Sequence, residues 1–142
     1  MPIRTADATW QGPLEKGNGT VRIGSGGIEA QYSFNSRFAE GPGTNPEELI
    51  GAAEAGCYSM ALAGDLGKAG YEPQRINTTA GVHINKNDDG WAIPQIDLRT
   101  EVEISGISES QLREIAEQTK DNCPVSRLLA TANITLEVKL AG

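Results

Sequence analysis

The stretch NPEELIGAAEAGCYSMALAG, residues 45–64, decides the fold of this chain because it carries a full set of helix-start signals. Asn45 is a favoured N-cap residue, Pro46 is tolerated at the first helical position, and Glu48 stands at the capping-box position three residues after the cap. The pattern therefore predicts a helix over residues 46–69, which a glycine at position 70 stops.

Glycine is frequent inside this predicted helix. Each glycine costs about 1 kcal/mol relative to alanine in a helix interior, so local propensity does not account for them. Close approach of another backbone explains these glycines, because glycine has no side chain to keep two backbones apart. We therefore expect a central, buried helix. The interior glycines are Gly51, Gly56, Gly64 and Gly67.

Alternation of apolar and polar residues predicts strands on both sides of the helix. Before the helix, strands are expected near Trp10, at 20–23 and at 28–34, with turns at Asn18-Gly19 and at GSGG (24–27). After the helix, strands are expected at 76–84, 96–104 and 134–140, with a turn at KNDDG (86–90). Strands in antiparallel hairpins, separated by helices, indicate an α+β fold.

Three further segments complete the expected order of elements. Ser108 and Gln111 form a capping box that begins a second helix, which ends near Asn122. Pro124 begins a short helical turn directly after it. The segment FNSRFAEGPGT (34–44), which is rich in glycine and proline near its end, predicts a loop.

Length, net charge and the distribution of apolar residues limit the number of domains, the possible partners and the expected compartment. A length of 142 residues predicts a single domain over residues 1–142, and the net charge of −7 argues against nucleic-acid binding. Glu54 and Asp65 interrupt the longest apolar stretch, so no membrane-spanning helix is expected. The amino terminus lacks the apolar region of a secretory signal, which predicts a cytoplasmic protein whose thiols are kept reduced.

The single histidine, His83, offers little chemistry. It falls on the polar face of its predicted strand, which indicates a solvated side chain rather than a catalytic base. One histidine and two distant cysteines do not form any metal-ligand spacing of structural sites. No metal site is therefore predicted.

The two cysteines, Cys57 and Cys123, are the remaining candidates. They can be buried thiols that act as small apolar side chains, a structural disulfide, or a redox pair. A structural disulfide would have to resist reduction in the expected cytoplasm. The residues alone leave these interpretations open.

A reactive Cys57 would need a positive charge from outside its own helix. The helix dipole acts only within the first turn, and Cys57 lies eleven residues after Pro46, roughly 16 Å from the helix start. Arg37, in the segment before the helix, is the best-placed cation. Glu47 or Glu48 in the first helical turn could pair with its guanidinium. For both acids, the preference of helix starts for negative charge is a purely structural explanation.

Cys123 has the stronger local signal for a thiolate. It directly precedes the Pro124 turn, where it is an N-cap-like residue, and Arg127 lies four residues further on. The local sequence therefore does not decide which sulfur reacts first.

Three segments resemble a known family in order and in spacing. They are FNSRF (34–38), GTNPEELIGAAEAGCYSMAL (43–62) and NCPVS (122–126). With these motifs the chain is similar, over nearly its whole length, to the osmotically inducible protein C family and its relatives, the organic hydroperoxide resistance proteins. The similarity is strongest to the osmotically inducible subgroup.

The resemblance implies a thiol peroxidase that needs no metal or organic cofactor. It assigns Cys57 as the peroxidatic thiolate and Cys123 as the resolving thiol, with Arg37 as the arginine that stabilises the thiolate and Glu47 as the carboxylate that orients the arginine. Cys57 would become a sulfenic acid and form a disulfide with Cys123. The family uses organic hydroperoxides in preference to hydrogen peroxide, and lipoylated proteins or dihydrolipoamide as the dithiol reductant.

The resemblance also implies an intertwined homodimer in which curved antiparallel sheets wrap long central helices. Glu54 fits this picture less well, because it lies three residues before Cys57 and its charge would oppose thiolate formation. We expect Glu54 to point away or to pair with a cation. Two alternatives to the enzyme are a non-enzymatic dimeric module that binds an apolar small molecule and a redox sensor.

Overall fold

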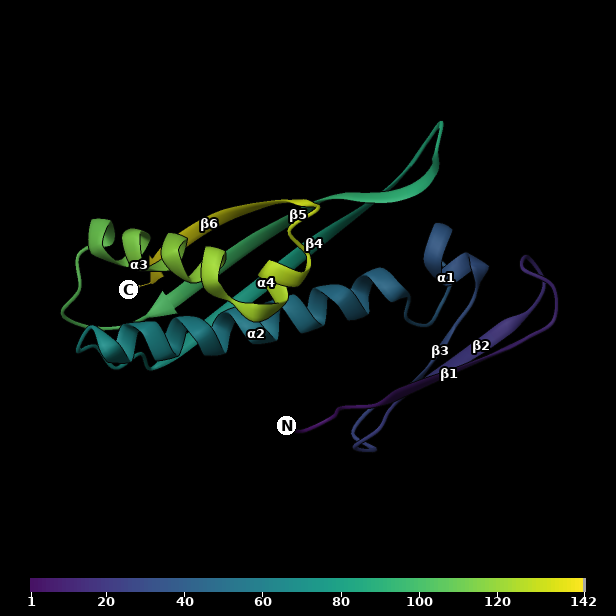
Figure 1. The fold of residues 1–142 in the computed structure, drawn as a ribbon, viewed down its shortest axis with the longest axis horizontal. Helices are drawn as coiled ribbons and strands as arrows, with labels where there is room; N and C mark the ends of the chain where they lie inside the picture. The colour runs from purple at the N-terminus through teal and green to yellow at the C-terminus, as the bar shows by residue number, and fades with distance from the viewer. Residues whose placement is uncertain (142) are drawn as a thin grey trace. The chain divides into compact units, whose positions relative to one another are not determined.

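The computed structural model describes residues 1–141 and has the α+β composition predicted from the sequence. Its contacts divide the chain into two compact units, the first over Met1–Leu49 and the second from Ile50 onward. Each unit contains one three-stranded sheet. Figure 1 labels the elements of both.

The first unit is built on the antiparallel sheet β1-β2-β3. Its strands are β1 (Ala6–Gln11), β2 (Asn18–Ile23) and β3 (Glu29–Tyr32). The predicted GSGG turn joins β2 to β3, whereas the turn predicted at Asn18-Gly19 is wrong because β2 begins there. Gly19 has a packing role instead: a Cβ at this position would come within 2.8 Å of the rings of both Trp10 and Tyr32.

A short helix, α1 (Phe34–Phe38), occupies part of the segment predicted as a loop. Ser33 is its N-cap, and a reciprocal capping box links the side chains of Ser33 and Ser36 to each other's backbone N–H groups. The predicted strand therefore ends before Phe34. The usual capping box has Glu or Gln three residues after the cap, so the Ser33-x-x-Ser36 pattern does not predict this helix by that rule.

The long helix α2 (Pro46–Lys68) begins and ends as predicted. The Asn45 Oδ1 accepts a hydrogen bond from the backbone N–H of Glu48 at 2.8 Å. The Glu48 carboxylate accepts from the Thr44 hydroxyl at 3.0 Å. Gly70 has a φ of +92°, the left-handed conformation in which glycine commonly stops a helix.

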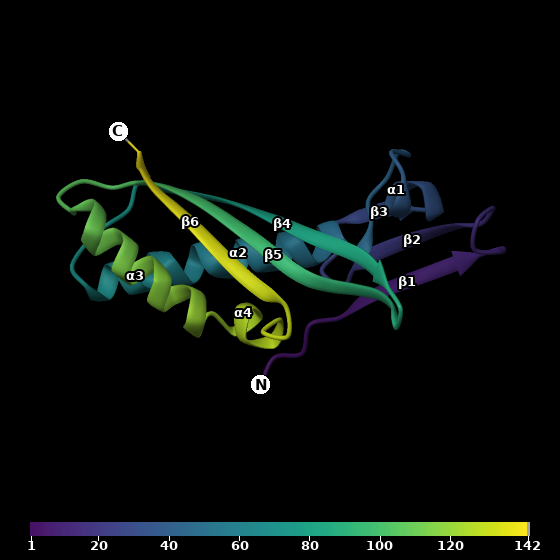
Figure 2. The same cartoon turned by 90° about the horizontal axis from the view of Figure 1, so that it is seen from above.

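The second unit contains the sheet β4-β5-β6 with helices on one of its faces (Figure 1 and Figure 2). The elements are β4 (Arg75–Asn87), β5 (Gly90–Glu103), α3 (Glu109–Asn122), α4 (Pro124–Leu128) and β6 (Asn133–Ala141). They lie close to the predicted ranges, except that β5 begins at Gly90 and not at the predicted residue 96. β4 and β5 are antiparallel, but β6 runs parallel to β5, which corrects the expectation of a wholly antiparallel sheet. The α3–α4 connection returns the chain to the starting end of β5, and a parallel pair requires such a crossover.

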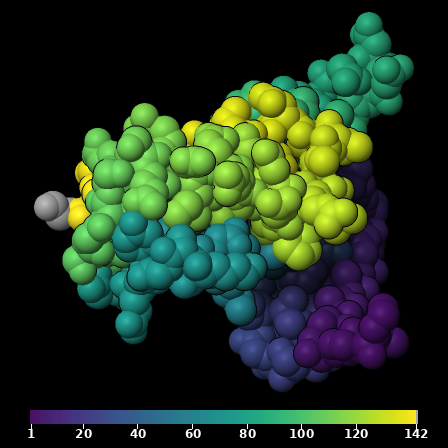
Figure 3. Space-filling model, turned by 60° about the vertical axis from the view of Figure 1, so that its left-hand side comes forward, coloured from purple at the N-terminus to yellow at the C-terminus, as the bar shows by residue number. Residues whose placement is uncertain are grey.

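The core of the second unit lies between α2, α3 and the sheet. Tyr58, Leu62 and Leu66 recur every four residues along α2 and are completely buried. They pack with buried residues of β5 and α3, and the Tyr58 hydroxyl donates to the Ala116 carbonyl of α3 at 3.1 Å. Figure 3 shows α3 beside α2 on this side of the unit.

The expectation of a wholly buried helix is only partly correct. Gly51 is buried, and a Cβ there would lie 3.3 Å from the Ala80 carbonyl oxygen of β4, so this glycine does permit a close backbone approach. The opposite side of α2 is exposed, and a Cβ at Gly56, Gly64 or Gly67 would meet nothing within 4 Å. Met60, on that side, is 80% exposed. Among residues 1–141, no helix is long and apolar enough to cross a membrane.

Candidate redox site

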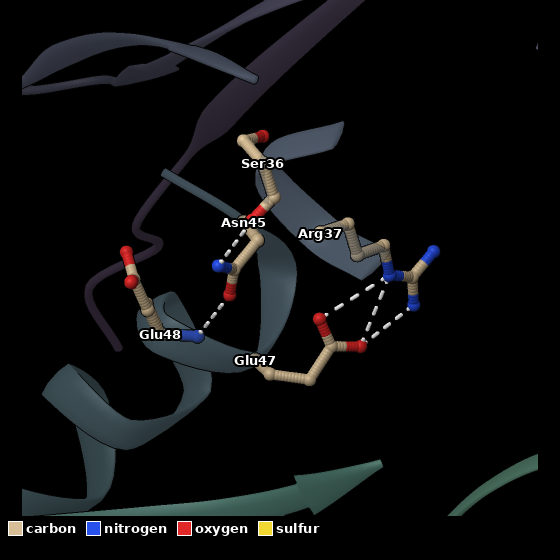
Figure 4. Close-up of polar contacts among 5 residues, drawn as sticks. All are labelled: Ser36, Arg37, Asn45, Glu47 and Glu48. Atoms are coloured by element: carbon tan, nitrogen blue, oxygen red, sulfur yellow. Dashed lines mark hydrogen bonds and ion pairs between the residues drawn. The ribbon is translucent and has the colours of Figure 1, made fainter. Parts of the chain in front are cut away.

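The first pair of predicted site residues, Arg37 and Glu47, forms a salt bridge in the first unit (Figure 4). The Arg37 Nη2 donates to the Glu47 Oε1 at 2.7 Å, and Nε donates to Oε1 and Oε2 at 3.1 and 3.2 Å. Glu47 is buried, whereas the Arg37 side chain is 36% exposed. Glu47 thus engages the guanidinium through Nε and Nη2, and a guanidinium has five N–H donors in all.

Two consecutive helices hold this salt bridge in place. Arg37 lies in the last turn of α1, and Glu47 lies in the first turn of α2. The Asn45 side chain joins the two, because its Nδ2 donates to the Ser36 carbonyl at 3.0 Å while its Oδ1 caps α2. Glu47 is therefore the predicted acid that pairs with Arg37, and Glu48 binds Thr44 instead.

An apolar hollow of about 170 Å³ adjoins Arg37 within the first unit. The Arg37 Cζ lies 5.1 Å from the centre of the Phe38 ring, a cation–π contact between two residues that both line the hollow. The aromatic residues near Arg37 in FNSRF are a sequence signal for such a hollow, but local sequence does not show that they line one together with Trp10 and Tyr32. The wall consists of Trp10, Leu14, Tyr32, Phe34 and Phe38, with Ser33 and Arg37.

The second pair, Cys57 and Cys123, meets in the second unit. Cys57 lies in α2 and Cys123 is the N-cap residue of α4, and their sulfur atoms are 3.0 Å apart. The two thiols are free in this structure, so they are neighbours without being joined. Cys123 stands at the predicted N-cap, but its thiol does not cap the helix; it donates to the Cys57 sulfur.

The surroundings of Cys57 within the second unit disfavour its thiolate. Burial raises the pKa of the Cys57 thiol, and the adjacent Cys123 raises it further through the hydrogen bond between the two sulfurs and through its charge when it is ionised. The charge of Glu54 acts in the same direction, and only a hydrogen bond from the backbone N–H of Val125 lowers the pKa. A reactive thiolate at this position therefore needs a cation.

Glu54 does not behave as predicted. It is completely buried, because it continues the four-residue stripe of Tyr58, Leu62 and Leu66 on the buried face of α2. It pairs with the hydroxyl of Ser126 instead of with a cation, and Oε2 has no hydrogen-bond partner among the described residues. The spacing of four residues between positions 54, 58, 62 and 66 is visible in the sequence and indicates that Glu54 is buried. Its separation of three residues from Cys57 does not indicate this.

His83 lies on the exposed face of β4, as predicted. Its Nε2 is 2.6 Å from the Asp97 Oδ2, and both side chains are almost half exposed. Hydrogen bonds from Thr135 and then His83 and Gln95 lower the pKa of Asp97 to about 2. Within residues 1–141, no group of three or more His, Cys, Asp or Glu side chains is placed to hold a metal ion.

Comparisons with known proteins identify the family. A family model described as OsmC-like protein matches residues 39–139. The chain is 48% identical to the peroxiredoxin OsmC of Escherichia coli (strain K12) over 138 residues, which are 96% of this chain and 96% of that protein.

Solved structures show the same fold. An OsmC-like protein from Mycoplasma pneumoniae has a TM-score of 0.78 at 15% identity, with 99% of each chain covered. The organic hydroperoxide resistance protein OhrB of Bacillus subtilis has a TM-score of 0.68 at 22% identity, with 96% of this chain and 98% of that chain covered. The high identity to a peroxiredoxin over almost the full length, together with the matching family model and folds, makes this chain a member of the OsmC-like protein family.

Proposed function

We propose that this protein is a thiol peroxidase that reduces organic hydroperoxides to alcohols through Cys57 and Cys123. The peroxidase class rests on the 48% identity to a peroxiredoxin over 96% of the chain. The single observation that carries the two-cysteine cycle is the distance of 3.0 Å between the two sulfur atoms. A disulfide requires little further approach from this position, because its sulfurs are about 2.05 Å apart.

The cycle has three steps that balance in atoms and electrons. The Cys57 thiolate attacks one peroxide oxygen, so that a sulfur–oxygen bond forms, the O–O bond breaks, and the leaving alkoxide takes a proton to become the alcohol. The Cys123 sulfur then attacks the Cys57 sulfenic acid, and water leaves. A dithiol finally reduces the disulfide and becomes a disulfide itself. Sulfur thus carries both electrons.

Reduced protein mixed with one equivalent of cumene hydroperoxide tests this cycle. Both thiols should disappear, and mass spectrometry should find an intramolecular disulfide between the peptides that contain Cys57 and Cys123. A non-enzymatic binding module would keep both thiols. A redox sensor would form the disulfide but would not turn over with any dithiol, so sustained peroxide consumption with dihydrolipoamide separates it from an enzyme.

Arg37 and Glu47 are proposed to make Cys57 reactive. The pKa of the Cys57 thiol is raised by burial and by its neighbours, so a guanidinium must supply the missing positive charge. An arginine can hold a thiolate and a peroxide oxygen at once, and the Arg37 side chain is 36% exposed, which leaves part of its guanidinium open to a substrate. Glu47 holds the other donors of the guanidinium, which fixes its orientation.

Replacement of Arg37 by methionine should therefore move the pH–rate profile of the peroxide step to higher pH. Loss of the positive charge disfavours the thiolate, so the profile should shift upward by about 1 to 2 pH units and the rate near neutral pH should fall about 10- to 100-fold. Stopped-flow measurement of the first oxidation between neutral and alkaline pH gives the profile. Arg99→Met, at an exposed ion pair with Glu137, is the control. A slower reaction with an unshifted profile would contradict this role.

The apolar hollow beside Arg37 supports a hydroperoxide with an organic tail as the substrate. Its walls are mainly aromatic and aliphatic carbon, which favours an alkyl or aryl group over water. Hydrogen peroxide has no such group, so it gains nothing from this surface. Arg37 at the rim offers hydrogen bonds to the peroxide end of the substrate.

Leu14→Ser should lower kcat/KM for cumene hydroperoxide about fivefold and leave kcat/KM for hydrogen peroxide unchanged. The side chain of Leu14 lines the hollow and is 64% exposed, so its loss removes apolar contact without opening a core. Ile28→Ser, at a comparably exposed apolar position of the same unit outside the hollow, is the matched control. Equal losses for both peroxides would argue against a tail-binding role.

The protein is further proposed to act in the cytoplasm, with a lipoylated protein or dihydrolipoamide as the reductant.

The protein is also proposed to be a homodimer. The exposed small residues of α2 around Met60 support a second copy, because they would let another backbone approach closely. Sedimentation should give about twice the chain mass of 15.0 kDa, and Met60→Lys should reduce it to a monomer. A monomeric wild-type protein would contradict this assembly.

A further inference from the structure

Glu54 is a buried acid for which the proposed cycle has no use. It is 0% exposed and shares the buried face of α2 with tyrosine and leucine side chains, so an apolar residue would fit its position. A buried carboxyl group is costly unless it is hydrogen-bonded. Glu54 makes one such bond, in which the Ser126 hydroxyl donates to Oε1, while Oε2 has no partner within residues 1–141. The hydrogen bond to Ser126 is therefore the contact that compensates the burial of the Glu54 carboxyl group.

Ser126 belongs to the same helical turn as Cys123. The backbone N–H of Arg127 donates to the Cys123 carbonyl at 2.9 Å and closes the first turn of α4. Ser126 follows Cys123 by three residues, and it is 3% exposed although it is a serine. Because the turn is closed, a contact that anchors Ser126 also restrains Cys123.

The Glu54–Ser126 bond and the Cys57–Cys123 contact connect the same two helices. On α2, Glu54 precedes Cys57 by three residues, and on the α4 turn Ser126 follows Cys123 by three residues. The two contacts are therefore one helical turn apart on each element. When the Cys57 sulfur gains an oxygen, the sulfur–sulfur contact is disrupted, whereas the Glu54–Ser126 bond can persist.

We propose that Glu54 is a positioning residue for disulfide formation, which anchors α4 through Ser126 and so keeps Cys123 within reach of the oxidised Cys57. The inference rests on the proposed function. In the step concerned, the Cys123 sulfur bonds to the Cys57 sulfur, the S–O bond of the sulfenic acid breaks, and the hydroxide leaves with the thiol proton as water. Rapid closure also limits overoxidation, because a second peroxide competes for the same sulfenic acid.

Ser126→Ala tests the proposal with a small change that leaves the apolar packing intact. The protein should react with cumene hydroperoxide within about twofold of the wild-type rate, but disulfide formation should slow about tenfold, because the buried anchor of Cys123 is lost. Rapid-quench mass spectrometry with dimedone separates the two steps by trapping the sulfenic acid. Glu54→Gln, made separately with Ser126 intact, should keep nearly wild-type disulfide formation, because the glutamine amide oxygen still accepts from the Ser126 hydroxyl.

Ser59→Ala is the matched control, because it removes a partly buried hydrogen bond of α2, to Thr78 at 2.8 Å, away from α4. It should leave disulfide formation unchanged. The proposal is overturned if Ser126→Ala closes the disulfide at the wild-type rate, or if both steps slow equally, as general loosening would produce. If the wild-type protein forms no sulfenic acid at all, the proposed function itself fails; if it cycles normally and Ser126→Ala does too, only the role of Glu54 fails.

Discussion

Cys57→Ser is expected to abolish peroxidase turnover. A serine hydroxyl stays protonated at neutral pH and is a far weaker nucleophile toward a peroxide oxygen than a thiolate, so dithiol-dependent consumption of cumene hydroperoxide should fall at least about 1,000-fold. Cys123, whose sulfur lies 3.0 Å from that of Cys57, should not replace it, because in the proposed cycle Cys123 reacts only with an oxidised Cys57. Oxidation of dihydrolipoamide, followed with and without enzyme, measures the remaining rate.

The same experiment must show that Cys57→Ser is folded. Serine is nearly isosteric with cysteine, and Cys57 is only partly buried, so the melting temperature should stay close to that of the wild type. Cys57→Ala, which removes the polar atom, is a second variant for the same comparison. Peroxidase activity that persists in both variants would mean that Cys123 or another group attacks the peroxide, and the assignment of Cys57 would be wrong.

Cys123→Ser is expected to react once and then stop. Its Cys57 thiol can still reduce one equivalent of peroxide, but no neighbouring thiol can displace the oxygen from the sulfenic acid. Steady-state turnover should fall about 100-fold or more, with the residual rate set by direct attack of the dithiol on the sulfenic acid. Loss of the Cys123 thiol should also lower the pKa of Cys57, because one of the groups that raise it is removed.

A burst of one equivalent of peroxide consumed per chain distinguishes this variant from Cys57→Ser, which should show no burst. Mass spectrometry should find Cys57 with one added oxygen, and with excess peroxide two and then three oxygens. Full multiple turnover by Cys123→Ser would contradict a resolving role. Cys123 would then be a buried thiol that lies beside the reactive cysteine without taking part.

Most elements of the fold followed from local signals. The cap at Asn45, the stop at Gly70 and the alternation in β4, β5 and β6 are encoded within a few residues, so they can be recognised without knowledge of the rest of the chain. The short helix α1 was missed because its cap uses two serines. The parallel direction of β6 was missed because strand patterns are the same for both directions.

The residues of the candidate site and two of its contacts were proposed from the sequence and the family resemblance, but the surroundings of Glu54 were not. Cys57, Cys123, Arg37 and Glu47 were named from their chemistry and from family motifs, and the choice of Glu47 over Glu48 agrees with the salt bridge. Nothing local indicated that Ser126 would meet the acid at position 54. Their positions lie 72 residues apart, so only packing brings them together.

By itself the sequence determined the helices, the strands and the residue types able to carry redox chemistry, because caps, stops, periodicity and reactive side chains are local properties. Tertiary structure alone decided which side of α2 is buried, where the two sulfurs stand and what the Glu54 carboxyl group touches. The physical reason is that a contact between distant residues depends on how whole helices and sheets pack against each other, and no short stretch of chain contains that information.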